Sequence, residues 1–181
     1  MKKIILFIAV VLITNIGFGQ GKYLTKEGFI TFFSHTLVED IKADNHQVLS
    51  IIDTDTGDIA IQLLMKSFMF KKALMQEHFN ENYIESHKYP KAKFKGHIIN
   101  YDKLTEGINE VEIEGTLSVH GVDKEIKTNA IIELSDGEII LSGEFIVAVE
   151  DFKIKIPKVV IKNIAKTIKV NFELKHQPYN K

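Results

Sequence analysis

Apolar and polar residues alternate along much of the chain. In residues 110–120 nearly every second position is apolar, and polar side chains occupy the positions between. Successive side chains of a strand point to opposite faces, so this pattern predicts a strand with one buried face. The same alternation predicts strands over 126–134, 141–149, 152–156 and 168–174, and further upstream over 29–35, 47–53 and 59–70. Another strand is expected after the Tyr89-Pro90 step.

The predicted strands are joined by short turn signals. These are Thr56-Gly57-Asp58, the His-Gly turn with Gly121-Val122-Asp123, Ser135-Asp136-Gly137 and the break at Pro157. Short connections favour antiparallel neighbours, because a parallel pair needs a long crossover. There is no repeating strand-helix alternation, which argues against a doubly wound α/β fold. The pattern therefore predicts an all-β protein, a single antiparallel barrel of about eight strands, with a two-sheet sandwich as the second choice.

One segment departs from the strand pattern. Around residues 71–86, Leu74, His78 and Phe79 recur at helical spacing, and Asn80 and Asn82 weaken the pattern soon afterwards. We expect a short helix of one or two turns there, ending before Tyr89-Pro90, because a proline pushes the preceding residue towards extended geometry.

The N-terminus has the features of a secretory signal peptide. Lys2 and Lys3 precede an unbroken apolar run, Ile4 to Ile13, and small residues flank Phe18. The run is about half as long as a membrane-spanning helix requires. We therefore expect residues 1–19 to be a signal peptide and 20–181 to form one domain in the periplasm or outside the cell, without stable membrane insertion after cleavage. A buried N-terminal strand is the alternative.

Composition adds two limits. Lys and Arg number 23 against 24 acidic residues, so the formal charge of -1 gives no overall drive to bind nucleic acid. Cysteine is absent, which rules out disulfides, thiolate metal ligands, thiol catalysis and a lipid-modified N-terminal cysteine.

No motif indicates catalysis. The seven histidines lack the spacings that place two imidazoles on one metal, and no serine lies in a nucleophile elbow. Asp53, Asp55 and Asp58 fit a turn better than a calcium loop. We therefore predict no catalytic residue, no metal and no cofactor. An enzyme of unknown type remains a third hypothesis, for which Glu77, His78, Glu81 and His87 are the raw material.

The apolar faces of the strands are the remaining candidate site. A barrel of about eight strands is either filled by its side chains or holds one small ligand. Apolar walls with a few polar groups would suit a hydrophobic ligand. The residues predicted to face the interior and to contact such a ligand are Phe29, Phe33, Phe68, Phe70, Leu117, Val119, Phe145, Val147, Phe152 and Phe172.

Two motifs resemble one family of exported bacterial proteins. The first is the step 89–96 (YPKAKFKG), preceded by His78-Phe79-Asn80 and Tyr83; the second is the hairpin 115–124 (GTLSVHGVDK). In this order they resemble the YceI-like family, and the resemblance spans roughly residues 28–175. Asp123 stands where threonine is common, and Tyr23 with Phe32-Phe33-Ser34-His35 departs from the family's tryptophan-containing start.

The resemblance implies a lipocalin-like barrel with a short helix. It also implies a polyisoprenoid or other long apolar chain inside, a structural hydrogen-bonding role for His120, and a homodimer as one allowed assembly. We therefore expect an exported lipid-binding protein. The alternative is a non-enzymatic structural or interaction protein with a filled barrel, acting through its surface at Gln76 to Lys88 or around Lys153, Lys155 and Lys158.

Overall fold

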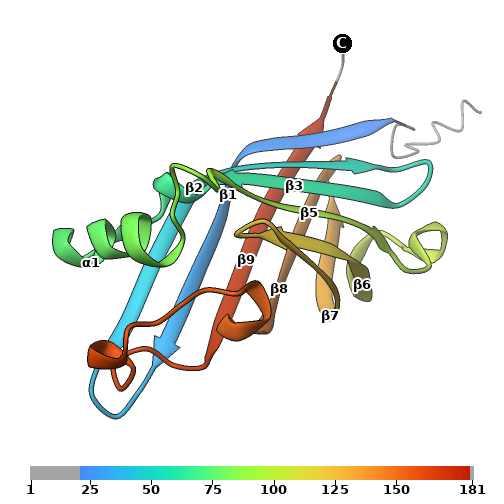
Figure 1. Ribbon diagram of the computed structural model, residues 1–181. Helices are drawn as coiled ribbons and strands as arrows, with labels where there is room; N and C mark the ends of the chain where they lie inside the picture. Colours follow the sequence, from blue (N-terminus) through green and yellow to red (C-terminus); the bar gives the residue numbers. More distant parts are fainter. Residues whose placement is uncertain (1–20, 180–181) are drawn as a thin grey trace, which may run out of the picture.

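The computed structural model describes residues 21–179. The signal peptide predicted for residues 1–19 lies outside the described residues. Strands dominate the chain, and the one α-helix of the described part is short (Figure 1). The elements are β1 (Lys22–His35), β2 (Asp40–Asp53), β3 (Asp58–Leu64), β4 (Met69–Phe70), α1 (Ala73–His78), β5 (Lys91–Ile98), β6 (Gly107–Val119), β7 (Val122–Ser135), β8 (Glu138–Ala148) and β9 (Thr167–Pro178).

Eight strands close into an antiparallel barrel, as the alternation predicted. Their order is β1-β9-β8-β7-β6-β5-β3-β2, and pairing of β1 with β2 completes the circle. The two-residue β4 pairs with β2 at Ala43 and Asp44, beyond the end of β3. The strand predicted over 59–70 is thus interrupted by a 3-10 turn at Met65–Ser67.

Two hairpin turns follow from residues that accept positive φ. The β6–β7 turn is His120-Gly121, with φ of 52° and 72°, and the β7–β8 turn is Asp136-Gly137, with φ of 52° and 76°. Two-residue turns of this kind match the right-handed twist of the strands that they join. At Gly121 a Cβ would lie 2.7 Å from the Tyr89 ring, so glycine is required there for space as well.

An irregularity in β1 decides which of its side chains point inwards. The pairing of β1 with β2 shifts register between Thr25 and Gly28, so the inward positions change from odd to even numbers along the strand. Ile30 and Phe32 therefore face the interior. Phe29 and Phe33, predicted to be interior, belong to the opposite face, where Phe33 pairs across the sheet with Lys42 and Lys169.

The half of the barrel away from α1 is filled with side chains. Inward residues of five strands are fully inaccessible there, namely Ile52, Ile98, Ile132, Ile139, Leu141 and Leu174. Tyr101, beside Tyr23, lies at this end in a 3-10 turn, and burial raises the pKa of its hydroxyl to about 12. This half provides much of the hydrophobic core, which continues into the wall of the other half.

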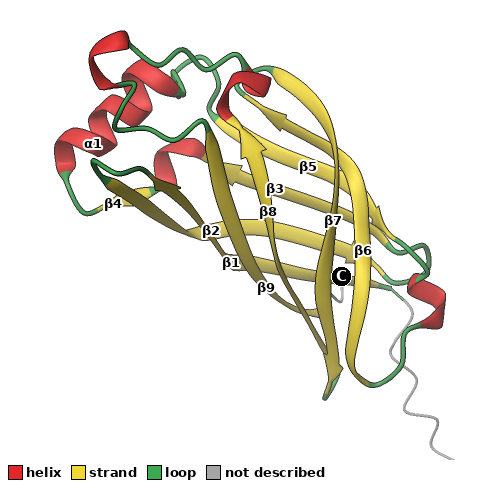
Figure 2. Ribbon diagram, turned by 90° about the horizontal axis from the view of Figure 1, so that it is seen from below, coloured by secondary structure: helices red, strands yellow, loops and turns green. Residues whose placement is uncertain are grey.

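The opposite end carries most of the non-strand elements. Figure 2 shows α1 and most of the short helices at that end of the barrel, while the 3-10 turn Tyr101–Lys103 lies at the other. α1 continues into a π-helical turn, Phe79–Tyr83, so the helix predicted around 71–86 is present. No helix within residues 21–179 is long and apolar enough to span a bilayer.

The strand predicted over 152–156 is wrong. Phe152 ends a 3-10 turn, Lys153 is left-handed with φ of 54°, and residues 154–157 belong to no strand. Ile154 and Ile156 still alternate with lysines because this β8–β9 loop turns one side towards the barrel. Alternation indicates that one side of a segment is buried, and a loop can show it without a neighbouring strand.

Candidate functional site

The barrel interior is hollow in the half next to α1. A cavity of about 460 Å³ lies there, within the range of roughly 300–1,000 Å³ that small-molecule sites occupy. Strand side chains form its wall, and residues of α1, the π-turn and the β8–β9 loop cover it. The wall includes Ile30, Phe32, Ile41, Leu63, Met65, Ala92, Leu117, Val119, Phe145, Val147, Ile168 and Val170.

A cluster of four phenylalanines attaches the helical segment to the barrel. Phe79 begins the π-turn, and its ring centroid lies 5.5 Å from Phe32 of β1, 5.9 Å from Phe68 and 5.0 Å from Phe70. Ring pairs at these separations add attraction beyond their buried area. The cluster lines the cavity, so the contacts that hold the helical segment also shape the site.

The mouth of the cavity carries a few polar groups. Exposed Lys72 and Leu74 belong to the lining, so the cavity reaches the surface at α1. Lys72 Nζ lies 2.8 Å from Glu39 Oε1, and Asn163 Nδ2 donates to Glu39 Oε2 at 3.3 Å. These two bonds, that from Lys72 first, lower the pKa of the Glu39 carboxyl. Glu39 thus ties together the β1–β2 turn, the segment before α1 and the β8–β9 loop.

A second, smaller space lies beside the main cavity. Its volume is about 70 Å³, and it shares Ile30, Leu63, Ala92, Leu117 and Phe145 with the main cavity. Phe94, Leu141 and Phe172 belong to its wall alone. The free space therefore narrows from the mouth towards the filled half of the barrel.

His120, at the β6–β7 turn, holds another part of the rim. His120 Nδ1 donates to the carbonyl of Phe152 at 2.9 Å, and Nε2 lies 3.4 Å from Glu85 Oε2. The His120 and Tyr89 rings are 4.4 Å apart. These contacts agree with the structural role expected for His120, because they fix Phe152 at the cavity wall and the segment that follows the helix.

The structure brings seven of the ten predicted site residues to the main cavity. They are Phe68, Phe70, Leu117, Val119, Phe145, Val147 and Phe152. Phe172 faces the smaller space instead. Their contact with a ligand stays a prediction.

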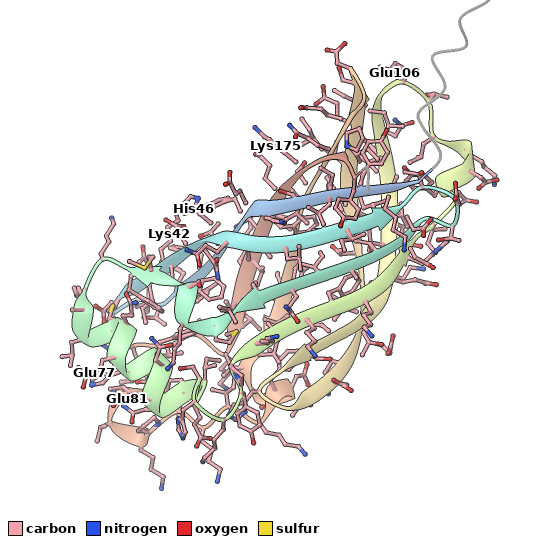
Figure 3. All side chains as sticks on the ribbon, turned by 90° about the horizontal axis from the view of Figure 1, so that it is seen from above. Lys42, His46, Glu77, Glu81, Glu106 and Lys175 are labelled. Carbon is pink, nitrogen blue, oxygen red and sulfur yellow. The ribbon has the colours of Figure 1, made fainter. Side chains whose placement is uncertain are left out.

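Phe29 and Phe33 line neither space, which corrects their predicted interior position. The ring of Phe29 lies 4.8 Å from that of His46, which is on the outer surface of β2 (Figure 3). The ring of Phe33 lies 6.2 Å from that of exposed His35.

Sequence reasoning missed part of the wall. Phe32 was missed because residues 29–33 (FITFF) have apolar side chains at both odd and even positions, so the pattern does not show which set faces the interior. Phe79 carried a helical-spacing signal but was not assigned to the interior. In the β8–β9 loop, Ile154 and Ile156 could be found through their alternation with lysines, whereas Val160 and Ile164 show no such alternation.

Ionisable groups do not converge in this site. Among residues 21–179, no group of three or more His, Asp or Glu side chains is placed to hold a metal ion. His78 lines the cavity, while His87 is exposed. The chemistry available is apolar contact, with an ion pair and an amide at the mouth.

Comparisons with known proteins agree with this architecture. Residues 18–176 match the YceI-like domain. The chain belongs to the YceI-like family. No curated protein matches the sequence.

Solved structures share the fold at low identity. A polyisoprenoid binding domain from Saccharophagus degradans superposes with a TM-score of 0.77 at 16% identity, covering 88% of this chain and 99% of that one. BcnA of Burkholderia cenocepacia gives 0.70 at 13% identity, covering 82% and 95%. The YceI protein of Campylobacter jejuni gives 0.55 at 16%, covering 99% and 94%. At these identities the likeness shows that the barrel fold is shared.

Proposed function

We propose that this protein binds an amphiphile with a long apolar tail, an isoprenoid or fatty-acyl chain, in the periplasm or outside the cell. The observation that carries the proposal is the cavity of about 460 Å³ with an almost wholly apolar wall. The polyisoprenoid-binding neighbour supports the same class of ligand.

Burial of apolar surface alone can supply the binding free energy of such a site, without specific hydrogen bonds or ion pairs to the tail. Burial of apolar surface contributes about 25 cal/mol per Å², or roughly 0.8 kcal/mol for each methylene of a tail. A head group would remain at the mouth, where Glu39, Lys72 and Asn163 offer both charges and an amide. This arrangement serves binding and carriage rather than catalysis, and the exported location rests on the signal peptide expected at residues 1–19.

The first test identifies the natural cargo. Protein purified from its own host is extracted with organic solvent and examined by mass spectrometry. We expect one lipid class at near-stoichiometric amount. Repeated recovery of no lipid, together with failure to bind added isoprenoid or fatty-acyl probes, would contradict the proposal.

The homodimer stays a prediction, which light scattering of the same sample would test.

The second test blocks the cavity and uses the neighbouring position as its control. Val147 lines the cavity, whereas Ile146 beside it on β8 is 70% exposed on the outer face. Val147→Phe should fill part of the space and weaken binding of a fluorescent fatty-acyl probe about tenfold or more, since several methylenes lose their place. Ile146→Phe should bind as the wild type does. Equal affinities for the two variants would place the ligand elsewhere.

A further inference from the structure

The loop between β8 and β9 is strongly basic. Residues 153–166, which we call the basic loop, contain Lys153, Lys155, Lys158, Lys162 and Lys166 and no acidic residue. All five lysines are exposed, and within residues 21–179 none has a carboxylate within 4.0 Å. The chain as a whole is nearly neutral, so this is a local concentration of free positive charge.

The same loop presents apolar side chains to both cavity and solvent. Ile156, Val160 and Ile164 line the cavity. Val159 and Ile161 point the other way and are 90% and 54% exposed. Exposed apolar side chains flanked by lysines suit a surface that is both apolar and anionic, such as a lipid interface.

The β1–β2 turn extends this surface across the mouth. Leu37 and Val38 at its tip are 103% and 62% exposed. The turn lies against the basic loop, because Asn163 donates to Glu39 and the backbone N–H of Ala165 donates to Ser34 Oγ at 2.9 Å. Figure 1 shows the turn and the loop together at the α1 end of the barrel.

A few acidic residues border this surface. Asp40 pairs with His35 and Asp151 with Lys124, while Glu150 is exposed just before the loop. Glu77 of α1 and Glu81 of the π-turn lie at the outer edge of the molecule (Figure 3). Glu39 is engaged by Lys72 and Asn163. The exposed lysines and the exposed apolar side chains therefore lie on the same side of the cavity mouth, the side formed by the basic loop.

We propose that the basic loop and the tip of the β1–β2 turn dock the protein on an anionic lipid bilayer. Val159, Ile161, Leu37 and Val38 enter the interface between head groups and acyl chains, while the lysines contact lipid phosphates. Docking is peripheral and reversible, because only a few side chains enter. It also places the cavity mouth against the bilayer, so a tail can pass between them without crossing water; this transfer role rests on the proposed function, whereas docking does not.

Vesicle flotation tests the docking directly. Wild-type protein is mixed with vesicles of phosphatidylcholine alone or mixed with phosphatidylglycerol, at low salt and at about 1 M salt, where the Debye length is about 3 Å. We expect binding to the anionic vesicles at low salt, and at least a tenfold loss at high salt or with the neutral lipid. Absence of binding to anionic vesicles, or equal binding to both lipids at every salt, would overturn the proposal.

Matched variants identify the surface. Val159→Ser with Ile161→Ser removes the apolar tips, and Ile108→Ser with Ile146→Ser removes two side chains, 74% and 70% exposed, elsewhere on the barrel. Lys158→Gln with Lys162→Gln removes loop charge, and Lys93→Gln with Lys95→Gln removes exposed charge from β5. Each loop pair should weaken partitioning roughly tenfold or more, at about fivefold for each lysine near the surface. The control pairs should bind as the wild type does, and equal loss in loop and control variants would overturn the assignment.

Two readouts separate this proposal from the function of the cavity. Circular dichroism confirms that each variant is folded, and the tail-binding assay is run on the same preparations. A protein that binds the fatty-acyl probe but never floats with anionic vesicles refutes docking alone. A protein that floats while its cavity accepts no tail refutes the proposed cargo and leaves docking standing.

Discussion

His176 is the least accessible ionisable side chain described. It lies on β9 in the filled half of the barrel and is 0% exposed. Nδ1–H donates to the carbonyl of Ile139 at 3.1 Å, and the hydroxyl of Ser50 donates to Nε2 at 2.8 Å. Burial lowers the pKa of the imidazole to about 4, so the ring is neutral at pH 7. Both ring nitrogens then have partners that suit the neutral form.

The lowered pKa predicts a loss of stability in mild acid. The unfolded chain binds a proton at His176 near pH 6.5, whereas the folded chain does not until about pH 4. The unfolded state therefore binds more protons in this window, and the free energy of unfolding falls as the pH drops through it. The full loss is about 3 kcal/mol, since each unit of pKa corresponds to about 1.4 kcal/mol. Urea unfolding at pH values between 7 and 4 measures it.

A comparison of variants isolates the contribution of His176. His176→Leu leaves Ser50 and Ile139 without their partner, so it should be less stable at pH 7 by about 1–3 kcal/mol. Its stability should nevertheless depend less on pH than that of the wild type. Exposed His46→Gln is the control and should retain the wild-type slope. Identical slopes in wild type and His176→Leu would show that His176 does not titrate in this window.

At the scale of elements, alternation predicted strands well and their environment less well. The segments 110–120 and 126–134 had one apolar face, and both became barrel strands with that face inwards. Residues 29–33 have apolar side chains on both faces of the strand, and only the register shift beside Gly28 decides which face points inwards. Such a shift depends on the partner strand, so no local pattern could reveal it.

The polar tie at the mouth was also invisible in the sequence. Glu39, Lys72 and Asn163 belong to three segments far apart in the chain, and closure of the barrel brings them together. The basic loop, by contrast, carries its alternation and its charge in its own residues. What a short segment encodes by itself could be predicted, and what depends on a distant partner could not.

The tie at Glu39 should control how fast a ligand enters and leaves. Glu39→Gln removes the charge that holds Lys72, so the three segments around the mouth should separate more readily. We expect faster release of a fluorescent fatty-acyl probe by about threefold or more in stopped-flow measurements, with little change in unfolding free energy, because exposed ion pairs contribute little to stability. Exposed Glu110→Gln on β6 is the control. Unchanged release rates in Glu39→Gln would mean that the tie does not limit exchange.

At the scale of the whole molecule, the barrel separates stability from binding. One half has inaccessible apolar side chains in close contact, and the other encloses the cavity. Sequence alone predicted the barrel but could not say which half is filled, because the alternation marks the inward residues of both halves in the same way.

This division predicts unequal responses to the same substitution. Ile132 is 0% exposed in the filled half, so Ile132→Ala should lower the free energy of unfolding by about 3–4 kcal/mol. Ile168 lines the cavity on β9 and is only partly buried. Ile168→Ala should cost about 1 kcal/mol, because part of its surface already faces empty space. Denaturant unfolding of the ligand-free protein compares the two, and equal losses would contradict the division.

The seam of the barrel has a consequence for biogenesis. β1 takes one neighbour from β2 and the other from β9, so Tyr23 lies between Ile52 and Pro178. While the polypeptide is being synthesised, the β1–β2 hairpin keeps an unsatisfied backbone edge until residues 167–178 arrive. An unpaired edge is a template for association with other chains. The interval before the last strand emerges is therefore when a nascent copy most needs a chaperone.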